Sequence, residues 1–310
     1  MKRLITSTLV AIAFVAGAAM HDRAMAADIF VAGSAMIQSY DLDGTFVDNK
    51  NLSWFTRGIA VTPNQQNIIV AEAGNQEVTR RTLGLALTGS NPIISFSTAD
   101  PYGMVYGPDK NLYAVEANAE KIRKYNGSTF AEIGNPFIDT NGDGGNFIVD
   151  LTITDQHIYV SSFSGNEILR YNYPSGTFDQ VVMDSGDGLG TPWGIDQGLD
   201  GNIYVASRNN AKIMKLNPNT LNVTEFASGI VPADGIQDLE WASDNWLYAL
   251  QAGGEGKPLL RFSADGLTVE TVVAGIGGST KNALALAIIP EPATLGLIAM
   301  GGLLMLRRRR

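Results

Sequence analysis

The sequence predicts an all-β protein of the β-propeller class, with six four-stranded blades. Three observations lead to this prediction. The 310 residues include 34 Gly and only 17% charged residues, a composition that suits short strands and turns better than helical bundles. An apolar strand core recurs about every 44 residues between the two ends of the chain. No stretch between those ends has the 3.6-residue hydrophobic period of an amphipathic helix.

The recurring core is the second strand of each unit. Its six copies are Ile29–Val31, Ile68–Val70, Leu112–Ala114, Ile158–Val160, Ile203–Val205 and Leu247–Ala249. A short strand precedes five of them and a third strand follows all six. Turn pairs such as Asp43-Gly44 and Asp265-Gly266 then lead to a fourth strand. Four short strands in a unit of this length are typical of propeller blades.

The first unit lacks a first strand, and the end of the repeat region supplies one. Residues 283–289 form an apolar run that has no other partners in the repeat. We expect it to pair with Ile29–Gly33 in the N-terminal blade, which closes the ring and removes the exposed inner edge. The propeller domain is therefore expected to span residues 27–289.

The N-terminal residues 1–26 have the pattern of a signal peptide. A basic start at Met1-Lys2-Arg3 is followed by the apolar run Leu4–Met20 and by the small-x-small cleavage site Ala24-Met25-Ala26. The alternative is an uncleaved membrane anchor. Either pattern predicts a propeller that is exported across the inner membrane.

The C-terminal residues 290–310 combine three features in order. Pro290, Glu291 and Pro292 precede an apolar helix over 293–306, and a basic tail follows, formed by Arg307, Arg308, Arg309 and Arg310. Fourteen helical residues span about 21 Å, less than the hydrocarbon core of a bilayer. This segment resembles the PEP-CTERM sorting signal. The resemblance implies an exosortase as processing partner and insertion in the inner membrane before processing. It also implies a Gram-negative bacterium that makes exopolysaccharide, with the protein in the cell envelope, at the cell surface or in the matrix.

Charge and cysteine content exclude several functions. The chain has no Cys, so disulfides, cysteine-based zinc sites and thiol nucleophiles are absent. Its formal net charge is −9, and residues 27–290 alone are near −14. Nucleic acids bind through basic patches, so a nucleic-acid partner is not expected.

Residues 194–206 read Gly-Ile-x-x-x-x-x-Gly-Asn-Ile-Tyr-Val-Ala and resemble NHL-type repeats. More loosely, the repeats resemble the six-bladed superfamily of the gluconolactonase and virginiamycin B lyase families. The lactonase-like families bind a divalent metal at the channel mouth through Glu, Asn and Asp. Here Trp193 stands where their Asn is expected, and Asp234 is displaced from the position of their Asp. The lyase family uses a histidine at the mouth, whereas the only histidine after residue 26, His157, begins a second strand elsewhere.

Residues that break the repeat are the candidates for function. Several of them fall where the innermost strands begin or the second strands end, so we expect them at one mouth of the channel: Glu72, Glu116, Tyr102, Trp193, Asp196 and Asp238. The carboxylates would bind a cation or a basic ligand; alternatively, they accept backbone N–H groups and pair with Arg or Lys. The aromatic rings would stack on a ligand or plug the channel.

A calcium loop is the second candidate site. Asp139, Asn141 and Asp143, with Gly144 next and Asp150 in the twelfth position, resemble an EF-hand loop. Asn146 and the absence of flanking helices depart from that pattern, and an ordinary Asx turn is the alternative. Ca²⁺ is the one cofactor that the sequence suggests.

A basic position also recurs in the third strands, at Arg80, Lys124, Arg170, Lys215 and Arg261. Because it recurs in five units, we expect these side chains to be structural, lying along apolar neighbours and pairing with carboxylates. The alternative is a ring that binds a polyanion.

Taken together, these features predict an exported, exosortase-sorted propeller that acts as a non-catalytic binding module. Its partner would be an exopolysaccharide or an envelope protein. The alternative is a divalent-metal-dependent lactonase, hydrolase or lyase with its site at the acidic channel mouth. A quinone-linked sugar dehydrogenase is less compatible, because such enzymes need a basic cofactor pocket.

Overall fold

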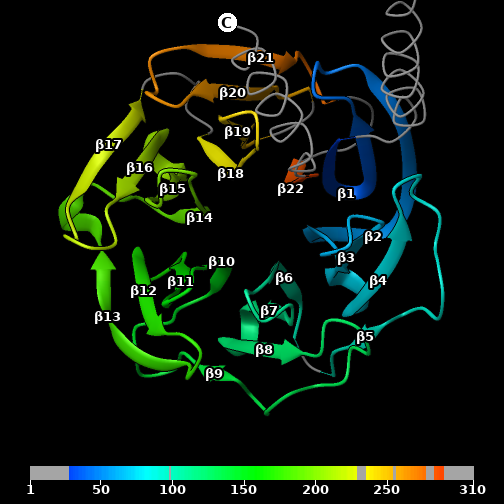
Figure 1. Ribbon diagram of the computed structural model, residues 1–310, viewed down its shortest axis with the longest axis horizontal. Helices are drawn as coiled ribbons and strands as arrows, with labels where there is room; N and C mark the ends of the chain where they lie inside the picture. The colour runs from blue at the N-terminus through cyan, green and yellow to red at the C-terminus, as the bar shows by residue number, and fades with distance from the viewer. Residues whose placement is uncertain (1–27, 98, 229–234, 254–255, 277–282, 290–310) are drawn as a thin grey trace, which may run out of the picture.

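The computed structural model describes residues 28–97, 99–228, 235–253, 256–276 and 283–289. These residues form a ring of antiparallel sheets around a central axis, with each sheet running outward from the axis (Figure 1). The all-β propeller prediction is therefore confirmed. The predicted signal peptide, residues 1–26, and the predicted sorting segment, residues 290–310, lie outside the described residues. Within the described part of the chain, no helix has the length and hydrophobicity needed to cross a membrane.

Four of the sheets have four strands each, in chain order from the axis outward. They are β6 (Pro101–Tyr106), β7 (Leu112–Glu116), β8 (Lys121–Tyr125) and β9 (Ile138–Asp139); β10 (Ile148–Ile153), β11 (His157–Ser162), β12 (Glu167–Asn172) and β13 (Thr177–Met183); β14 (Pro192–Gln197), β15 (Ile203–Ser207), β16 (Lys212–Leu216) and β17 (Val223–Ser228); and β18 (Ile236–Trp241), β19 (Trp246–Gln251), β20 (Leu259–Ser263) and β21 (Val269–Val273).

The fifth sheet has six strands in the order β22-β1-β2-β3-β4-β5. Their bounds are β22 (Ala283–Ile288), β1 (Ile29–Tyr40), β2 (Phe46–Val61), β3 (Asn67–Glu72), β4 (Glu77–Thr82) and β5 (Ile94–Ser95). The prediction of six separate four-stranded blades is therefore wrong: there are five sheets. The reason is the length of β1 and β2. The first half of β2 pairs with β1 and its second half pairs with β3, so hydrogen bonding continues where a break was expected.

The ring closes as the sequence predicted. β22 pairs antiparallel with the start of β1, from Ile29 opposite Ile288 to Gly33 opposite Ala283. The inner strands β22, β2, β6, β10, β14 and β18 contact one another in turn around the axis.

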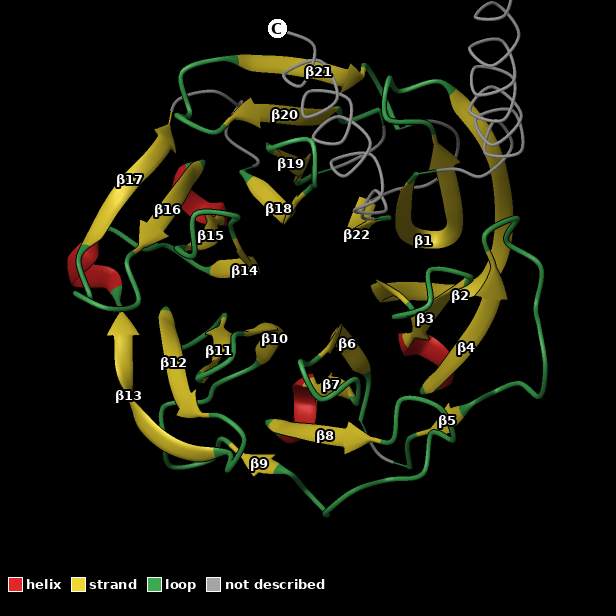
Figure 2. Cartoon of the chain, viewed as in Figure 1, coloured by secondary structure: helices red, strands yellow, loops and turns green. Residues whose placement is uncertain are grey.

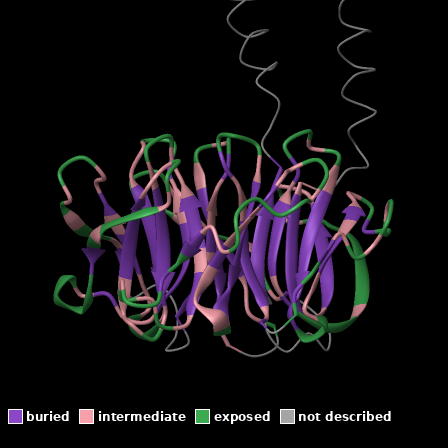
Figure 3. Ribbon diagram, turned by 90° about the horizontal axis from the view of Figure 1, so that it is seen from below, coloured by how far each residue is buried: buried purple, intermediate pink, exposed green. Residues whose placement is uncertain are grey.

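The second strands form the core because both of their faces are covered by neighbouring sheets. Every residue of Leu112–Glu116 and of Ile203–Ser207 is buried, which explains why these strands are apolar without alternation. Buried apolar side chains of neighbouring sheets pack together in clusters. The exposed residues lie mostly on the loops and outer strands (Figure 3).

Four short 3₁₀ helices complete the described fold (Figure 2). They are η1 (Ala73–Asn75), η2 (Ala117–Ala119), η3 (Ser185–Asp187) and η4 (Arg208–Asn210). η1 forms the turn between β3 and β4, η2 that between β7 and β8, and η4 that between β15 and β16.

The recurring basic position is structural, as predicted. Lys124 and Lys215 bind Asp109 and Asp200 at 2.9 and 2.8 Å. The same two aspartates accept hydrogen bonds from the hydroxyls of buried tyrosines on β7 and β15. Arg170 and Arg261 pair with acidic residues on the outer strands of their sheets, at 2.5 and 2.6 Å.

Candidate functional site

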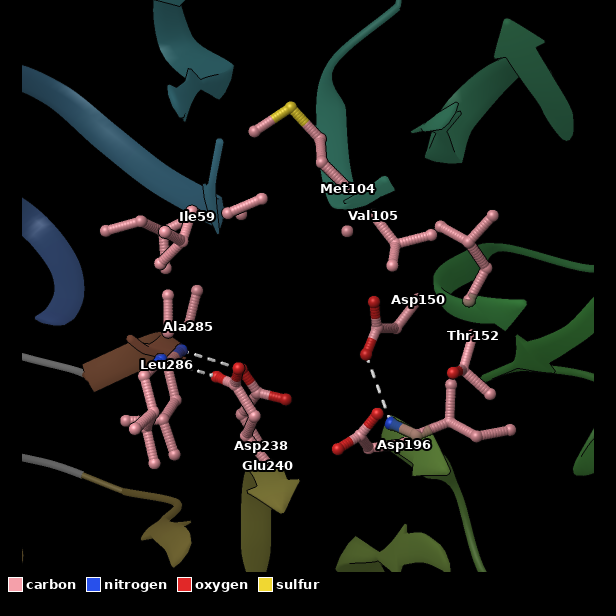
Figure 4. Close-up of a pocket in the computed structure, with 18 of the residues that line it drawn as sticks. Ile59, Met104, Val105, Asp150, Thr152, Asp196, Asp238, Glu240, Ala285 and Leu286 are labelled. Atoms are coloured by element: carbon pink, nitrogen blue, oxygen red, sulfur yellow. Dashed lines mark hydrogen bonds between the residues drawn. The ribbon is translucent and has the colours of Figure 1, made fainter. Parts of the chain in front are cut away.

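A cavity of about 340 Å³ runs along the axis of the ring. Its walls come from the inner strands, and four carboxylates line one side of it: Asp150 on β10, Asp196 on β14, and Asp238 and Glu240 on β18 (Figure 4). The opposite side is mostly apolar, with Ile59, Met104 and Ala285. All four acidic side chains are half-buried.

Each carboxylate accepts a backbone N–H from the next inner strand around the ring. Asp150 Oδ2 accepts from Ile195 at 3.1 Å and Asp196 Oδ2 accepts from Trp241 at 2.8 Å. On the closing strand β22, the N–H groups of Leu286 and Ile288 donate to Asp238 and Glu240 at 2.8 and 2.9 Å. The inner edge of each sheet has no strand partner for these N–H groups, so a carboxylate from the neighbouring sheet satisfies them.

The remaining carboxylate oxygens also have partners in two cases. Asp196 Oδ1 accepts the N–H of Gln197 at 2.7 Å, and Asp238 Oδ1 accepts the N–H of Leu239 at 2.9 Å. The hydrogen bonds between sheets connect three successive pairs of inner strands. Asp150 joins β10 to β14, Asp196 joins β14 to β18, and Asp238 and Glu240 join β18 to β22. The contacts therefore support the alternative that these carboxylates accept hydrogen bonds from backbone N–H groups.

Glycine on the preceding inner strand makes room for these carboxylates. A Cβ atom on Gly103 would lie 2.1 Å from Asp150 Oδ1, and one on Gly194 would lie 2.4 Å from Asp238 Oδ1. Aspartate therefore fits at this strand position only where the preceding inner strand has no side chain in the way.

Burial raises the pKa values of all four acids. It raises the pKa of Asp196 to about 6 and that of Asp238 to about 7, with the Asp196 charge adding to the rise at Asp238. For Asp150 and Glu240, burial and then the neighbouring carboxylates hold the pKa well above its ordinary value. The cavity therefore retains protons at a pH where exposed carboxylates have lost them.

The acids do not assemble into a metal site among the described residues, where no group of three or more His, Cys, Asp or Glu is placed to hold an ion. In the predicted calcium loop, Asp139 Oδ1 accepts from the backbone and the side-chain amide of Asn141 at 3.1 and 3.0 Å, as in an Asx turn. Asp150 faces the cavity and binds β14 (Figure 4). The structure therefore does not bring together the four residues of the calcium prediction.

Glu72 and Glu116 do not belong to the cavity. Each binds a basic residue on the third strand of its own sheet: Glu72 contacts Arg81 at 3.2 Å, and Glu116 contacts Arg123 at 2.8 Å. Both carboxylates are buried. The prediction that they lie at the channel mouth is wrong, because their side chains turn back along the sheet toward these arginines.

Aromatic residues gather where the inner strands begin. Tyr102 and Trp193 have ring centroids 6.3 Å apart, and Phe147 and Phe163 pack on them edge-on at 5.5 and 5.1 Å. Tyr102 and Trp193 are buried, although Trp193 also lines the cavity. Their burial favours the alternative in which these rings fill the end of the channel.

The sequence analysis missed Arg57, which lines the cavity beside this cluster. Its guanidinium lies 5.1 Å from the centroid of the Tyr102 ring. A signal was available, because Arg57 directly precedes Gly58 as Tyr102 precedes Gly103 and Trp193 precedes Gly194. The same position holds Val149 and Gln237 before Asp150 and Asp238, so Arg57 is the one charged residue there and breaks the repeat.

No protein-family model and no curated protein matches this chain. Many solved structures are similar to it, including the following three. A protein of unknown function from Bacteroides caccae has a TM-score of 0.67 at 16% identity and covers 86% of this chain and 100% of its own. The nidogen/laminin complex has a TM-score of 0.66 at 13% identity and covers 84% and 97%. Virginiamycin B lyase from Staphylococcus aureus has a TM-score of 0.53 at 17% identity and covers 70% and 69%. At these identities the similarity establishes the fold and no activity.

Proposed function

We propose that this protein is an exported β-propeller that binds a small ligand in its axial cavity and does not act on it chemically. The observation that carries the proposal is the use of the four cavity carboxylates as acceptors for backbone N–H groups of neighbouring sheets. A catalytic carboxylate needs a free oxygen directed at substrate or metal. Here each acid has one oxygen bound to a neighbouring sheet, and in Asp196 and Asp238 the second oxygen also accepts a backbone N–H.

The proposal that the protein is exported rests on the two ends of the sequence. The basic start, apolar run and Ala24-Met25-Ala26 site support a signal peptide, and the segment from Pro290 to Arg310 supports processing by an exosortase in the cell envelope. Delivery to the envelope or matrix of a Gram-negative bacterium would place the cavity among polysaccharides and envelope proteins. Fractionation of the host, with and without residues 290–310, tests this part.

One observation favours an enzymatic function as a second candidate. The pKa of Asp238 is raised to about 7, the range in which a carboxyl group is useful as a general acid or base near neutral pH. A hydrolase or lyase that acts on lactones would use this group with a divalent metal. Turnover of a lactone panel by the purified chain with added Mg²⁺ or Ca²⁺, lost in Asp238→Asn, would establish this candidate in place of the first.

Ligand binding is tested by thermal melts of the full chain against monosaccharides, sugar acids and lactones. A ligand that binds only the folded chain adds about 2.7 kcal/mol to its stability at a hundredfold excess over the dissociation constant. Val105→Phe fills the cavity wall, whereas Val181→Phe adds the same bulk on the exposed outer strand β13. A stabilising ligand should lose its effect in the first variant and keep it in the second. If no compound gives a shift that Val105→Phe removes, the cavity is not the binding site.

A further inference from the structure

Arg57 is the only basic side chain among the described residues that line the cavity. It is half-buried on β2, one residue before the strand reaches the cavity wall at Gly58. Its guanidinium lies over two rings, at 5.1 Å from the centroid of Tyr102 and 5.9 Å from that of Phe55. No carboxylate or carbonyl in the described part of the chain accepts a hydrogen bond from it.

Four other arginines in the described ring are ion-paired. Arg81, Arg123, Arg170 and Arg261 each bind a carboxylate at 2.5 to 3.2 Å. A guanidinium has five N–H donors arranged to grip both oxygens of a carboxylate. Arg57 therefore presents at the rim of the cavity the same guanidinium group with which these four arginines bind carboxylates within the protein.

An exposed aromatic surface lies beside this guanidinium. The Arg57 guanidinium lies 5.9 Å from the centroid of the Phe55 ring, so the two side chains are neighbours. The Phe55 side chain is 50% exposed. An aromatic face of this kind packs against a flat or ring-shaped ligand, and Arg57 lies at the edge of that face.

The cavity behind Arg57 presents hydrogen-bond acceptors. Asp150, Asp196, Asp238 and Glu240 lie along one wall, and Thr152 also lines the cavity (Figure 4). A ligand that enters from the rim must bring donors to this wall, and sugar hydroxyls are such donors. At about 340 Å³ the cavity is at the small end of ligand sites, which usually measure about 300 to 1,000 Å³.

We propose that the cavity binds an acidic sugar, with the carboxylate of the sugar held by Arg57 and its hydroxyls directed to the carboxylate wall. This assignment rests on the proposed ligand-binding function and names its ligand class. The ring of the sugar packs on Phe55. A neutral sugar lacks the group that Arg57 binds, and a simple aromatic acid lacks the hydroxyls that the wall accepts.

Isothermal titration of the full chain, purified in a mild non-ionic detergent, tests the assignment. The three probes are D-galacturonate, D-galactose and benzoate. We expect galacturonate to bind at least about tenfold more tightly than either of the others, because a charged hydrogen-bonded pair is worth about one to two orders of magnitude in affinity. Arg57→Gln should remove that advantage and leave the weak binding of galactose unchanged. Arg57→Lys should retain only part of it, because lysine cannot grip both oxygens.

The matched control is Arg80→Gln. Arg80 also lies over an aromatic ring, Phe130 at 5.8 Å, but it is on β4 and does not line the cavity. It should leave galacturonate binding unchanged. Far-UV circular dichroism and a melt of each variant establish that it is folded before titration.

The outcomes separate this assignment from the function on which it rests. If galactose binds as tightly as galacturonate and Val105→Phe abolishes both, the cavity binds sugars but the role of Arg57 is wrong. If benzoate equals galacturonate, the ligand is a carboxylate but not a sugar, and the assignment is overturned. If none of the probes binds the folded wild-type chain, both this assignment and the proposed binding of sugars in the cavity are refuted.

Discussion

Raising the pH from 5 to 8 is expected to destabilise this propeller, because acids in the cavity must then lose their protons. The pKa values of Asp196 and Asp238 rise from an ordinary value of 3.8 to about 6 and about 7 on folding. Acids of this kind bind protons more tightly in the folded chain than in the unfolded chain. Their contribution to the free energy of unfolding is therefore largest below pH 4 and falls as the pH rises through the folded pKa.

The magnitude follows from these values. One pKa unit corresponds to about 1.4 kcal/mol. Between pH 5 and pH 8, linkage reduces the free energy of unfolding by about 1 kcal/mol through Asp196 and by about 3 kcal/mol through Asp238. For a chain of this size, that total lowers Tm by about 10 °C. Asp150 and Glu240 act in the same direction, because their pKa values are also raised.

Asp238→Asn isolates the largest of these effects. The asparagine keeps one acceptor of the two that now bind Leu286 and Leu239, and the lost hydrogen bond costs about 1 to 3 kcal/mol. Asparagine carries no charge, so the variant avoids the cost of ionising a buried carboxyl group. That gain in the free energy of unfolding is about 4 kcal/mol at pH 8 but only about 2 kcal/mol at pH 5. The variant should therefore be more stable than the wild type at pH 8 and about equal to it at pH 5.

Urea unfolding of the full chain, followed by circular dichroism at both pH values, measures these differences. Asp265→Asn is the control, because Asp265 is exposed in a turn and its hydrogen bonds lower its pKa, so it stays ionised throughout this range. If Asp238→Asn destabilises the chain equally at pH 5 and pH 8, the reasoning is refuted. Asp238 would then be ionised in the folded state, with a bound cation as its compensating charge.

Three further predictions concern other parts of the structure. Glu72→Gln leaves the buried guanidinium of Arg81 without its counter-charge and should cost about 3 to 5 kcal/mol in urea unfolding; a change below 1 kcal/mol would contradict this. Gly194→Ala places a Cβ 2.4 Å from Asp238 Oδ1 and should cost about 1 to 3 kcal/mol; an unchanged midpoint would show that the carboxylate moves aside freely. Because Asp150 faces the cavity, millimolar Ca²⁺ should shift Tm by less than about 1 °C, and chelation should have no effect. A rise in Tm of several degrees with Ca²⁺ that Asp143→Ala abolishes would contradict this and would support a calcium site at residues 139–150.

The repeat, the strand positions and the closure of the ring could be predicted from the sequence. Each second strand carries its own apolar core, and each turn carries its own Gly, Asn or Asp, so these signals are local. The pairing of Ile29–Gly33 with the C-terminal strand was also predictable, because a single unit lacked a strand and a single run remained to supply it. The number of separate sheets was not predictable from the sequence. Nothing in residues 46–61 indicates that β2 continues without a break from its pairing with β1 to its pairing with β3.

Residue types at the site were predictable, but their partners were not. Asp196 and Asp238 line the axial cavity, whereas Glu72 and Glu116 turn back to arginines in their own sheets. The hydrogen bonds that decide the role of the cavity acids join residues 45 to 48 positions apart, across sheet boundaries. The sequence by itself thus determined the architecture, because local patterns specify strands and turns. Only the tertiary structure decided which charges meet, because the distance between two side chains on neighbouring sheets depends on how the whole ring packs.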